Sequence, residues 1–262
     1  MPTFDQLILS DIHLYADKNS ISTHNEVLFE CLASLENQGY KFRRVILLGD
    51  IFEDWYINAS EEIEDNPKIA NDFFSQLDRL GELGKETLKL FVKGNHDSVS
   101  PFMRLDPKVK QLLDANSFEI TERYEERGVV YVHGHQGSIS KLQWFIQMLV
   151  CKIWYYFCTL FRSPKMYEWG FSLVEKNASF RSADPAVRAT FYEDLLRRIK
   201  PGNNAIVFGH THVPLIDEKY RLVNTGDWME NQTFVIRDDN ALILYSYVSE
   251  GHLVEQGKLT VS

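Results

Sequence analysis

The stretch Val45-Ile46-Leu47-Leu48-Gly49-Asp50 decides the fold. Four consecutive aliphatic residues are typical of a strand that is buried on both faces, as in a parallel sheet covered by helices. A carboxylate directly after such a strand lies at the edge where α/β sheets bind their ligands. Asp50 is therefore the first candidate functional residue, although an Asp in this place is more often a turn former or a helix N-cap.

Other apolar runs of the chain end in potential metal ligands as well. These ends are Asp11-Ile12-His13, Gly94-Asn95-His96-Asp97, His133-Gly134-His135 and Gly209-His210-Thr211-His212. A lone His is usually a packing residue, but packing alone does not explain this co-location. Mixed His, Asp and Asn ligands suit manganese, iron or zinc. Two such ions about 3.5 to 4 Å apart require a bridging carboxylate, and Asp50 is the residue best placed to supply it.

The composition sets the broad class of the protein. A chain of 262 residues with 44% apolar residues is long enough for one large α/β domain. Because 37 acidic residues outnumber 28 basic ones, the net charge of −9 argues against nucleic acid as a partner. Three cysteines without framework spacing fit a reducing compartment. No signal peptide is recognisable at the start of the sequence, so we expect a cytoplasmic protein.

Strand and helix patterns alternate along the first half of the chain, which predicts an α/β sheet with right-handed crossovers. We expect a single domain over residues 1–262, without internal repeats. The acidic segment 59–66 reads as a surface loop. Strands are expected at 7–10, 45–48, 88–92, 118–121 and 129–133, and helices at 23–39, 69–81 and 107–113. In the last third, a buried strand at 205–208 precedes antiparallel strands at 213–216, 222–223, 233–236 and 241–247, which are expected to build a second sheet.

Residues 138–200 interrupt this alternation and predict a helical cap insertion. Almost every position from Leu142 to Phe161 is apolar or aromatic, which is long enough for a membrane span. Lys152 would lie at the bilayer centre, and a single crossing would separate His133 from His210, so a span is rejected. The apolar side then faces either the protein core or a lipid-like substrate. Further helices are expected near 171–177 and from 185 to 199.

The ligand-bearing ends, taken in order, resemble the motif set of the calcineurin-like metallophosphoesterases over roughly residues 5 to 247. This resemblance implies a sandwich of two mixed sheets flanked by helices, with a dinuclear site on the loops at the strand ends. It implies that one ion is held by Asp11, His13, Asp50 and His212, and the other by Asp50, Asn95, His133 and His210. His96 is similar to the family's histidine that protonates the leaving oxygen, and Glu53 stands where that histidine's carboxylate partner is expected.

Within the family, two segments resemble the branch of UDP-2,3-diacylglucosamine pyrophosphohydrolases of lipid A synthesis. They are Gly49-Asp50-Ile51-Phe52-Glu53-Asp54-Trp55 and Asn224-Thr225-Gly226-Asp227-Trp228-Met229-Glu230. The substrate implied is a small phosphorylated molecule such as an acylated nucleotide sugar. The well-studied members have Arg where this chain has His96 and Asp where it has His135, so this chain is closer to the His-containing relatives. A phosphatase or phosphodiesterase of unknown substrate is the alternative, and a binding scaffold without catalysis is a third.

The resemblance also implies a mechanism with two divalent ions, manganese being expected first and iron or zinc next. Two such ions lower the pKa of a bridging water from about 15.7 towards about 7, so that hydroxide is available to attack phosphorus at neutral pH. The sequence does not indicate an oligomeric state. The aromatic excess of the cap suits an interface or peripheral contact with a membrane surface, which would be the inner membrane.

Overall fold

The computed structural model describes residues 3–15, 23–54, 59–81, 87–97, 104–137, 141–161 and 185–261. Its first sheet has seven strands in the order β12-β11-β10-β1-β2-β3-β4. Strands β1 to β4 are parallel, whereas β10 to β12 continue the sheet in antiparallel fashion from β1. The strands are β1 (Thr3–Leu9), β2 (Lys41–Leu47), β3 (Leu88–Val92), β4 (Phe118–Thr121), β10 (Thr233–Asp238), β11 (Ala241–Tyr247) and β12 (Leu253–Thr260).

The second sheet has five strands in the order β5-β6-β7-β9-β8. Its interior strands β6, β7 and β9 are parallel, and the edge strands β5 and β8 are antiparallel to their neighbours. The strands are β5 (Tyr124–Glu126), β6 (Val129–Tyr131), β7 (Ala205–Phe208), β8 (Leu215–Asp217) and β9 (Leu222–Asn224). The predicted α/β class with two mixed sheets flanked by helices is confirmed.

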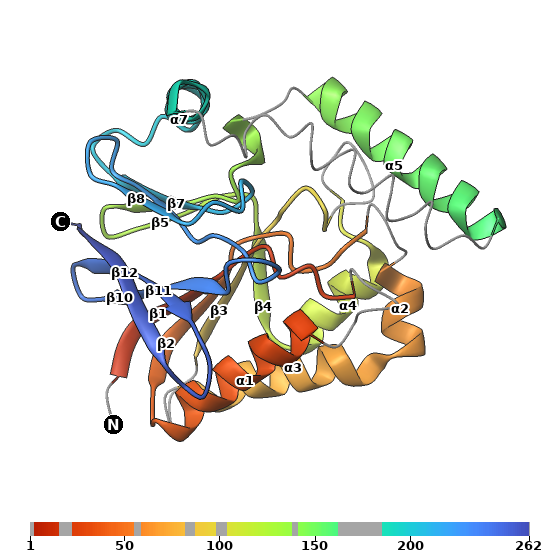
Figure 1. Ribbon diagram of the computed structural model, residues 1–262, viewed down its shortest axis with the longest axis horizontal. Coiled ribbons are helices and arrows are strands. Elements are labelled where there is room, and N and C mark those ends of the chain that lie inside the picture. Colours follow the sequence, from red (N-terminus) through yellow and green to blue (C-terminus); the bar gives the residue numbers. More distant parts are fainter. Residues whose placement is uncertain are drawn as a thin grey trace.

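The layers follow from the alternation of side chains along the strands. In β1, Leu7 and Leu9 face helices α1 (Thr23–Asn37), α3 (Pro67–Arg79) and α4 (Pro107–Ala115), whereas Ile8 faces the second sheet. The outer face of the second sheet is covered by α7 (Pro185–Ile199) through Phe191 and Leu195. The order is therefore helices, sheet, sheet, helix (Figure 1). Since α7 packs on this sheet, the final part of the predicted 138–200 insertion belongs to the outer helical layer.

Several local expectations were wrong. The acidic segment 59–66 forms a helix, α2 (Ala59–Asp65), because Ala59 and Glu62 are buried and the acidic groups at Glu61 and Glu64 occupy its exposed side. The strands after residue 213 do not form one antiparallel sheet. Strand β10 pairs with β1 in the first sheet, and β9 runs parallel to β7 in the second.

The first part of the insertion forms α5 (Lys141–Phe161), which lies at the periphery of the molecule, away from both sheets (Figure 1). Within the residues the structure describes, no helix combines the length and the apolar character needed to cross a bilayer. The expected helix near 171–177 lies outside the described residues.

Candidate metal centre

Five loops at the carboxyl ends of strands bring the candidate ligands together. Asp11 and His13 follow β1, Asp50 follows β2, and Asn95 and His96 follow β3 in the first sheet. In the second sheet, His133 follows β6, and His210 and His212 follow β7. Main-chain hydrogen bonds join the first two loops, since Asp11 N donates to Gly49 O and His13 N donates to Asp50 O, both at 3.0 Å. The centre therefore sits between the two sheets and takes side chains from both.

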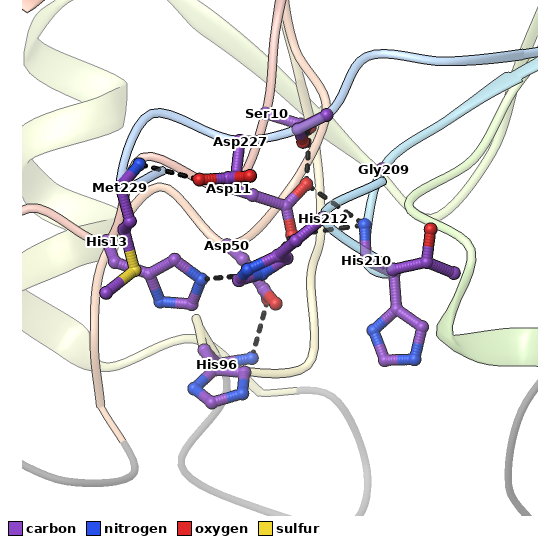
Figure 2. Close-up of polar contacts among 12 residues, drawn as sticks. Ser10, Asp11, His13, Asp50, His96, Gly209, His210, His212, Asp227 and Met229 are labelled. Carbon is purple, nitrogen blue, oxygen red and sulfur yellow. Dashed lines mark hydrogen bonds and ion pairs between the residues drawn. The ribbon is translucent and has the colours of Figure 1, made fainter. Parts of the chain in front are cut away.

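The candidate ligands form two adjacent groups with donor atoms close enough to share one ion, and His13 also belongs to a third such group with Glu53 and His96. The first group is Asp11, His13 and His212, and the second is Asp50, His133 and His210. His210 N donates to both oxygens of Asp11 at 3.0 Å, which links the groups, and Figure 2 shows Asp11, His13, Asp50 and His212 close together. The first group shares its three residues with one ligand set that the sequence resemblance implies, and the second group with the other, while the binding of ions by these residues stays a prediction.

The contacts within each group fit a cation. His133 Nδ1 donates to Leu48 O at 2.9 Å, which turns its Nε2 toward Asp50 Oδ2 at 3.0 Å. In the first group, the Nε2 atoms of His13 and His212 face each other at 3.4 Å. Acceptor atoms this close require a proton or a metal ion between them. A buried set of imidazole and carboxylate donors is what manganese, iron or zinc binds.

Electrostatics keep the carboxylates ionised. Burial opposes the charge on Asp50, but the facing His133 outweighs this effect and holds the pKa of that carboxyl well below its usual range. Burial likewise lowers the pKa of His133, but Asp50 dominates and raises it to about 9. Burial together with His133 holds the pKa of His210 well below its usual value, so this imidazole is neutral, which is the form that binds metals.

The Glu53 carboxylate contacts both His96 and His13. Its Oε1 and Oε2 are each 2.9 Å from His96 Nδ1, and Oε2 is also 2.9 Å from His13 Nδ1. Burial raises the pKa of Glu53, but His96 and His13 outweigh it and lower the pKa to about 2. A permanently ionised carboxylate thus orients the expected catalytic His96 and, in addition, the expected ligand His13. The second contact was not foreseen from the sequence.

The sequence also gave no sign of the role of Asp97. This buried carboxylate accepts hydrogen bonds from Asp50 N, Ile51 N, Phe52 N and Gly94 N at 2.8 to 2.9 Å. It therefore ties the loop after β2 to the loop after β3 and fixes Asp50 between them. Asp50 Oδ1 in turn accepts from His96 N at 2.7 Å.

The segment 224–230 supports the centre from the second sheet. Asn224 Nδ2 donates to Gly209 O at 3.0 Å and to Thr211 Oγ1 at 2.8 Å, which shapes the loop carrying His210 and His212. Asp227 accepts from Met229 N and Glu230 N and so closes its own turn (Figure 2). Neither side chain belongs to the two ligand groups.

His135, whose part the sequence left open, lies beside the second group. Its ring centroid is 5.6 Å from that of His133 and 6.3 Å from that of His210. Burial and the neighbouring His133 lower its pKa to about 3, so it is neutral at physiological pH. The residue therefore adds no charge to the centre.

Comparison with known proteins agrees with this geometry. A family model described as calcineurin-like phosphoesterase matches residues 6–214, a range that contains every candidate ligand. No curated protein matches the sequence. Among solved structures, a dimetal phosphatase from Danio rerio is similar with 12% identity and a TM-score of 0.48, all of both chains being covered. Since the family model spans most of the chain and the loops inside it meet in two adjacent groups of metal-binding side chains, this chain belongs to the calcineurin-like phosphoesterase family and is a metal-dependent hydrolase.

Proposed function

We propose that this phosphoesterase cleaves a pyrophosphate or phosphodiester bond in an acylated nucleotide sugar such as UDP-2,3-diacylglucosamine. Support comes from the sequence around Asp50 and at 224–230, which resembles that branch of the family, and from the apolar helix inserted between His133 and His210. The observation that carries the hydrolytic part is the position of Asp50. This carboxylate lies 3.0 Å from His133 Nε2, and the backbone N of Asp50 donates to Asp97 Oδ2 at 2.8 Å.

Two divalent cations, for which manganese is the first candidate, would supply the activated water and neutralise the phosphoryl oxygens. Asp11, His13, Asp50 and His212 would hold one cation, and Asp50, Asn95, His133 and His210 the other. Because the chain has a net charge of −9, the cations also make the site attractive to an anionic substrate.

His96 is the proposed proton donor to the departing oxygen. Its Nδ1 faces the ionised Glu53, which orients the ring and directs Nε2 away from that carboxylate. Nε2 is therefore the ring nitrogen that would act as the general acid. Glu53 also contacts His13, so one carboxylate positions the proton donor and a metal-binding imidazole together.

The rival function is a phosphatase or phosphodiesterase with a small, water-soluble substrate. It is favoured by His96 and His135, which stand where the well-studied pyrophosphohydrolases have Arg and Asp. A site that takes different groups at these two positions contacts the phosphate differently, so the substrate class is open to direct test.

A hydrolysis panel on the manganese-loaded protein distinguishes the two functions. The substrates are UDP-2,3-diacylglucosamine, the same sugar nucleotide without acyl chains, a cyclic nucleotide, p-nitrophenyl phosphate and bis-p-nitrophenyl phosphate. We expect kcat/KM for the acylated compound to exceed that of the simple esters by on the order of 10²-fold or more, because remote binding energy promotes catalysis. Faster cleavage of a water-soluble ester would establish the rival, and failure on all five would refute both.

A further inference from the structure

Ser10 follows β1, directly precedes the candidate ligand Asp11, and is buried. Its Oγ donates a hydrogen bond to Asp11 Oδ2 (Figure 2). The hydroxyl also lies 3.5 Å from Gly226 O, but a carbonyl at that distance is a poorer acceptor than a close, ionised carboxylate. The single proton of Ser10 therefore serves Asp11.

A second hydroxyl reaches Ser10 from the other sheet. Thr225 follows β9, is buried, and places its Oγ1 2.5 Å from Ser10 Oγ. Because Ser10 has one proton and gives it to Asp11, Thr225 is the donor of this pair. A hydroxyl that accepts one hydrogen bond donates a stronger one, so the chain from Thr225 through Ser10 strengthens the contact with Asp11.

The two oxygens of Asp11 have different surroundings. Oδ2 accepts from Ser10 and packs against Gly209, where an added Cβ would overlap both Oδ2 and the Ser10 hydroxyl. Oδ1 instead lies 3.2 Å from His212 Nε2, which belongs to the same ligand group as Asp11. His210 N donates to both oxygens at 3.0 Å and so cannot select one of them. The selection therefore depends on Ser10.

We propose that Ser10, assisted by Thr225, is a positioning residue for the first cation, the one assigned to the ligand set that contains Asp11. By engaging Oδ2, it leaves Oδ1 as the single oxygen through which Asp11 binds that ion. Contacts behind a ligating carboxylate orient it, and their loss typically costs about 10- to 100-fold in metal affinity. This role rests on the proposed two-ion centre, but no substrate enters it.

Main-chain contacts hold the same loops together without the hydroxyls. Trp228 N donates to Asp11 O at 3.2 Å, and Thr225 N donates to Phe208 O at 2.9 Å. If Ser10 lost its hydroxyl, Thr225 Oγ1 would still have Phe208 O as an acceptor at 3.2 Å. A variant that lacks one hydroxyl should therefore keep the fold.

The test is manganese binding by the full-length protein after removal of metal, followed by titration calorimetry and electron paramagnetic resonance. The variants are Ser10→Ala and Thr225→Val, the second of which replaces the hydroxyl by a methyl group of similar size. Thr225→Ser, which keeps the hydroxyl, is the conservative control. Ser34→Ala in α1 is the control for loss of a serine hydroxyl elsewhere, since Ser34 Oγ accepts from Gln38 Nε2 at 2.9 Å.

We expect the wild type and both controls to bind two manganese ions and to give the spectrum of a magnetically coupled pair. Ser10→Ala should bind one ion as the wild type does and the other at least about tenfold more weakly, so that the spectrum of an isolated ion appears at limiting manganese. Thr225→Val should weaken the same ion by a smaller factor. The melting temperatures of the metal-free proteins should agree.

Two further backgrounds identify the ion that is affected. His13→Ala removes a candidate ligand of the first cation and His133→Ala one of the second, so each should leave one bound ion. Adding Ser10→Ala should weaken the ion that remains in His133→Ala by about tenfold or more. The ion that remains in His13→Ala should keep its affinity.

Equal weakening in the two backgrounds, or a Ser10→Ala protein that binds both ions as the wild type does, overturns the positioning role and leaves the two-ion centre standing. A lower melting temperature of metal-free Ser10→Ala without a selective change in one ion would assign the hydroxyl to the fold and overturn the role as well. A wild type that binds one manganese ion or none would refute the two-ion centre and the role together. Since no substrate is present, the result is independent of which phosphoester the enzyme cleaves.

Discussion

At the scale of single residues, Asp50 and His96 are neighbours with different expected roles. Asp50 contacts His133 and is expected to serve both ions, so Asp50→Ala should abolish metal retention and hydrolysis together. His96→Ala should retain metal and lose roughly 10² to 10⁴ in kcat, the usual contribution of a general acid. Metal analysis and bis-p-nitrophenyl phosphate assays check both, with the exposed His252→Ala as a control that changes neither. An active, metal-free Asp50→Ala protein would contradict the assignment.

Asp54 gives a prediction about pH. Burial raises the pKa of this carboxyl to about 7, despite the opposing charge of Lys152. The folded protein thus keeps Asp54 protonated at a pH where the unfolded chain, with a pKa near 3.8, is ionised. Its contribution to stability is fully present below about pH 4 and is lost as the pH rises through 7.

Asp54→Asn, which resembles the protonated acid, should therefore change the melting temperature little at pH 4.5 and raise it by several degrees at pH 8.5. Thermal unfolding at both pH values measures this difference. The exposed Asp114→Asn is the matched control and should show no such pH dependence. Equal shifts of Asp54→Asn at the two pH values would rule out the carboxyl as the titrating group.

Local sequence pattern points to the candidate ligands but not to the residues that hold them in place. Each ligand follows an apolar strand, so local pattern was sufficient to find Asp11, Asp50 and His210. Asp97 was passed over because its four hydrogen-bond donors are mostly backbone groups some 45 residues away, which no local pattern reveals. The contact between Glu53 and His13 depends in the same way on two loops meeting.

At the scale of elements, close approach of the loops depends on glycine. A Cβ added to Gly94 would lie 2.2 Å from both the N and the Oδ1 of Asp50. The Asp50 backbone cannot move aside, since Asp97 holds it and its neighbours. Gly94→Ala should therefore displace Asp50 and lower metal content and kcat/KM by at least about tenfold, given the sensitivity of such sites to shifts near 1 Å.

The control for this change is Gly257→Ala in β12. There the nearest atom to the new Cβ is the flexible end of the Ile216 side chain at 3.3 Å. Metal content measured by mass spectrometry after gel filtration should stay at the wild-type value in Gly257→Ala and fall in Gly94→Ala. Full metal occupancy in Gly94→Ala would show that the loops after β2 and β3 can move apart without loss of the metal site.

Elements were predicted well where their burial pattern is strong. The strands at 88–92 and 205–208 were placed correctly, whereas the strand before Asp50 was expected at 45–48 and spans Lys41–Leu47, because its first half is partly polar. Strand β12 was missed because it lies at a sheet edge and most of its side chains are exposed, so its sequence resembles a loop. The three-residue β5 was missed because so short a strand carries almost no periodic signal. Which sheet β10 joins depends on its pairing with β1, more than 200 residues away.

At the scale of the whole molecule, the centre joins the two sheets. Its candidate ligands follow β1, β2 and β3 on one side and β6 and β7 on the other. Ions bound there stabilise the folded state by mass action, by about 2.7 kcal/mol at 100 times the Kd. Removal of metal with a chelator should lower the melting temperature by roughly 5 to 10 °C, at 2 to 4 °C per kcal/mol.

Calorimetry before and after chelation measures this effect, and added manganese should restore the original melting temperature. Asp50→Ala serves as the control, because a protein that binds no metal should be insensitive to the chelator. A wild-type melting temperature that chelation leaves unchanged would mean that bound ions do not hold the sheets together.

Five residues of the centre share a backbone feature with a wider implication. Asp11, His13, Asp50, His210 and His212 all have φ between 49° and 67°, a region that side chains with a Cβ rarely adopt. Such conformations are tolerated where surrounding contacts enforce them. Replacing positive-φ residues by glycine is a common way to relieve backbone strain and raise thermostability. In this protein it would remove five of the candidate metal-binding side chains, so stability design should leave these positions unchanged.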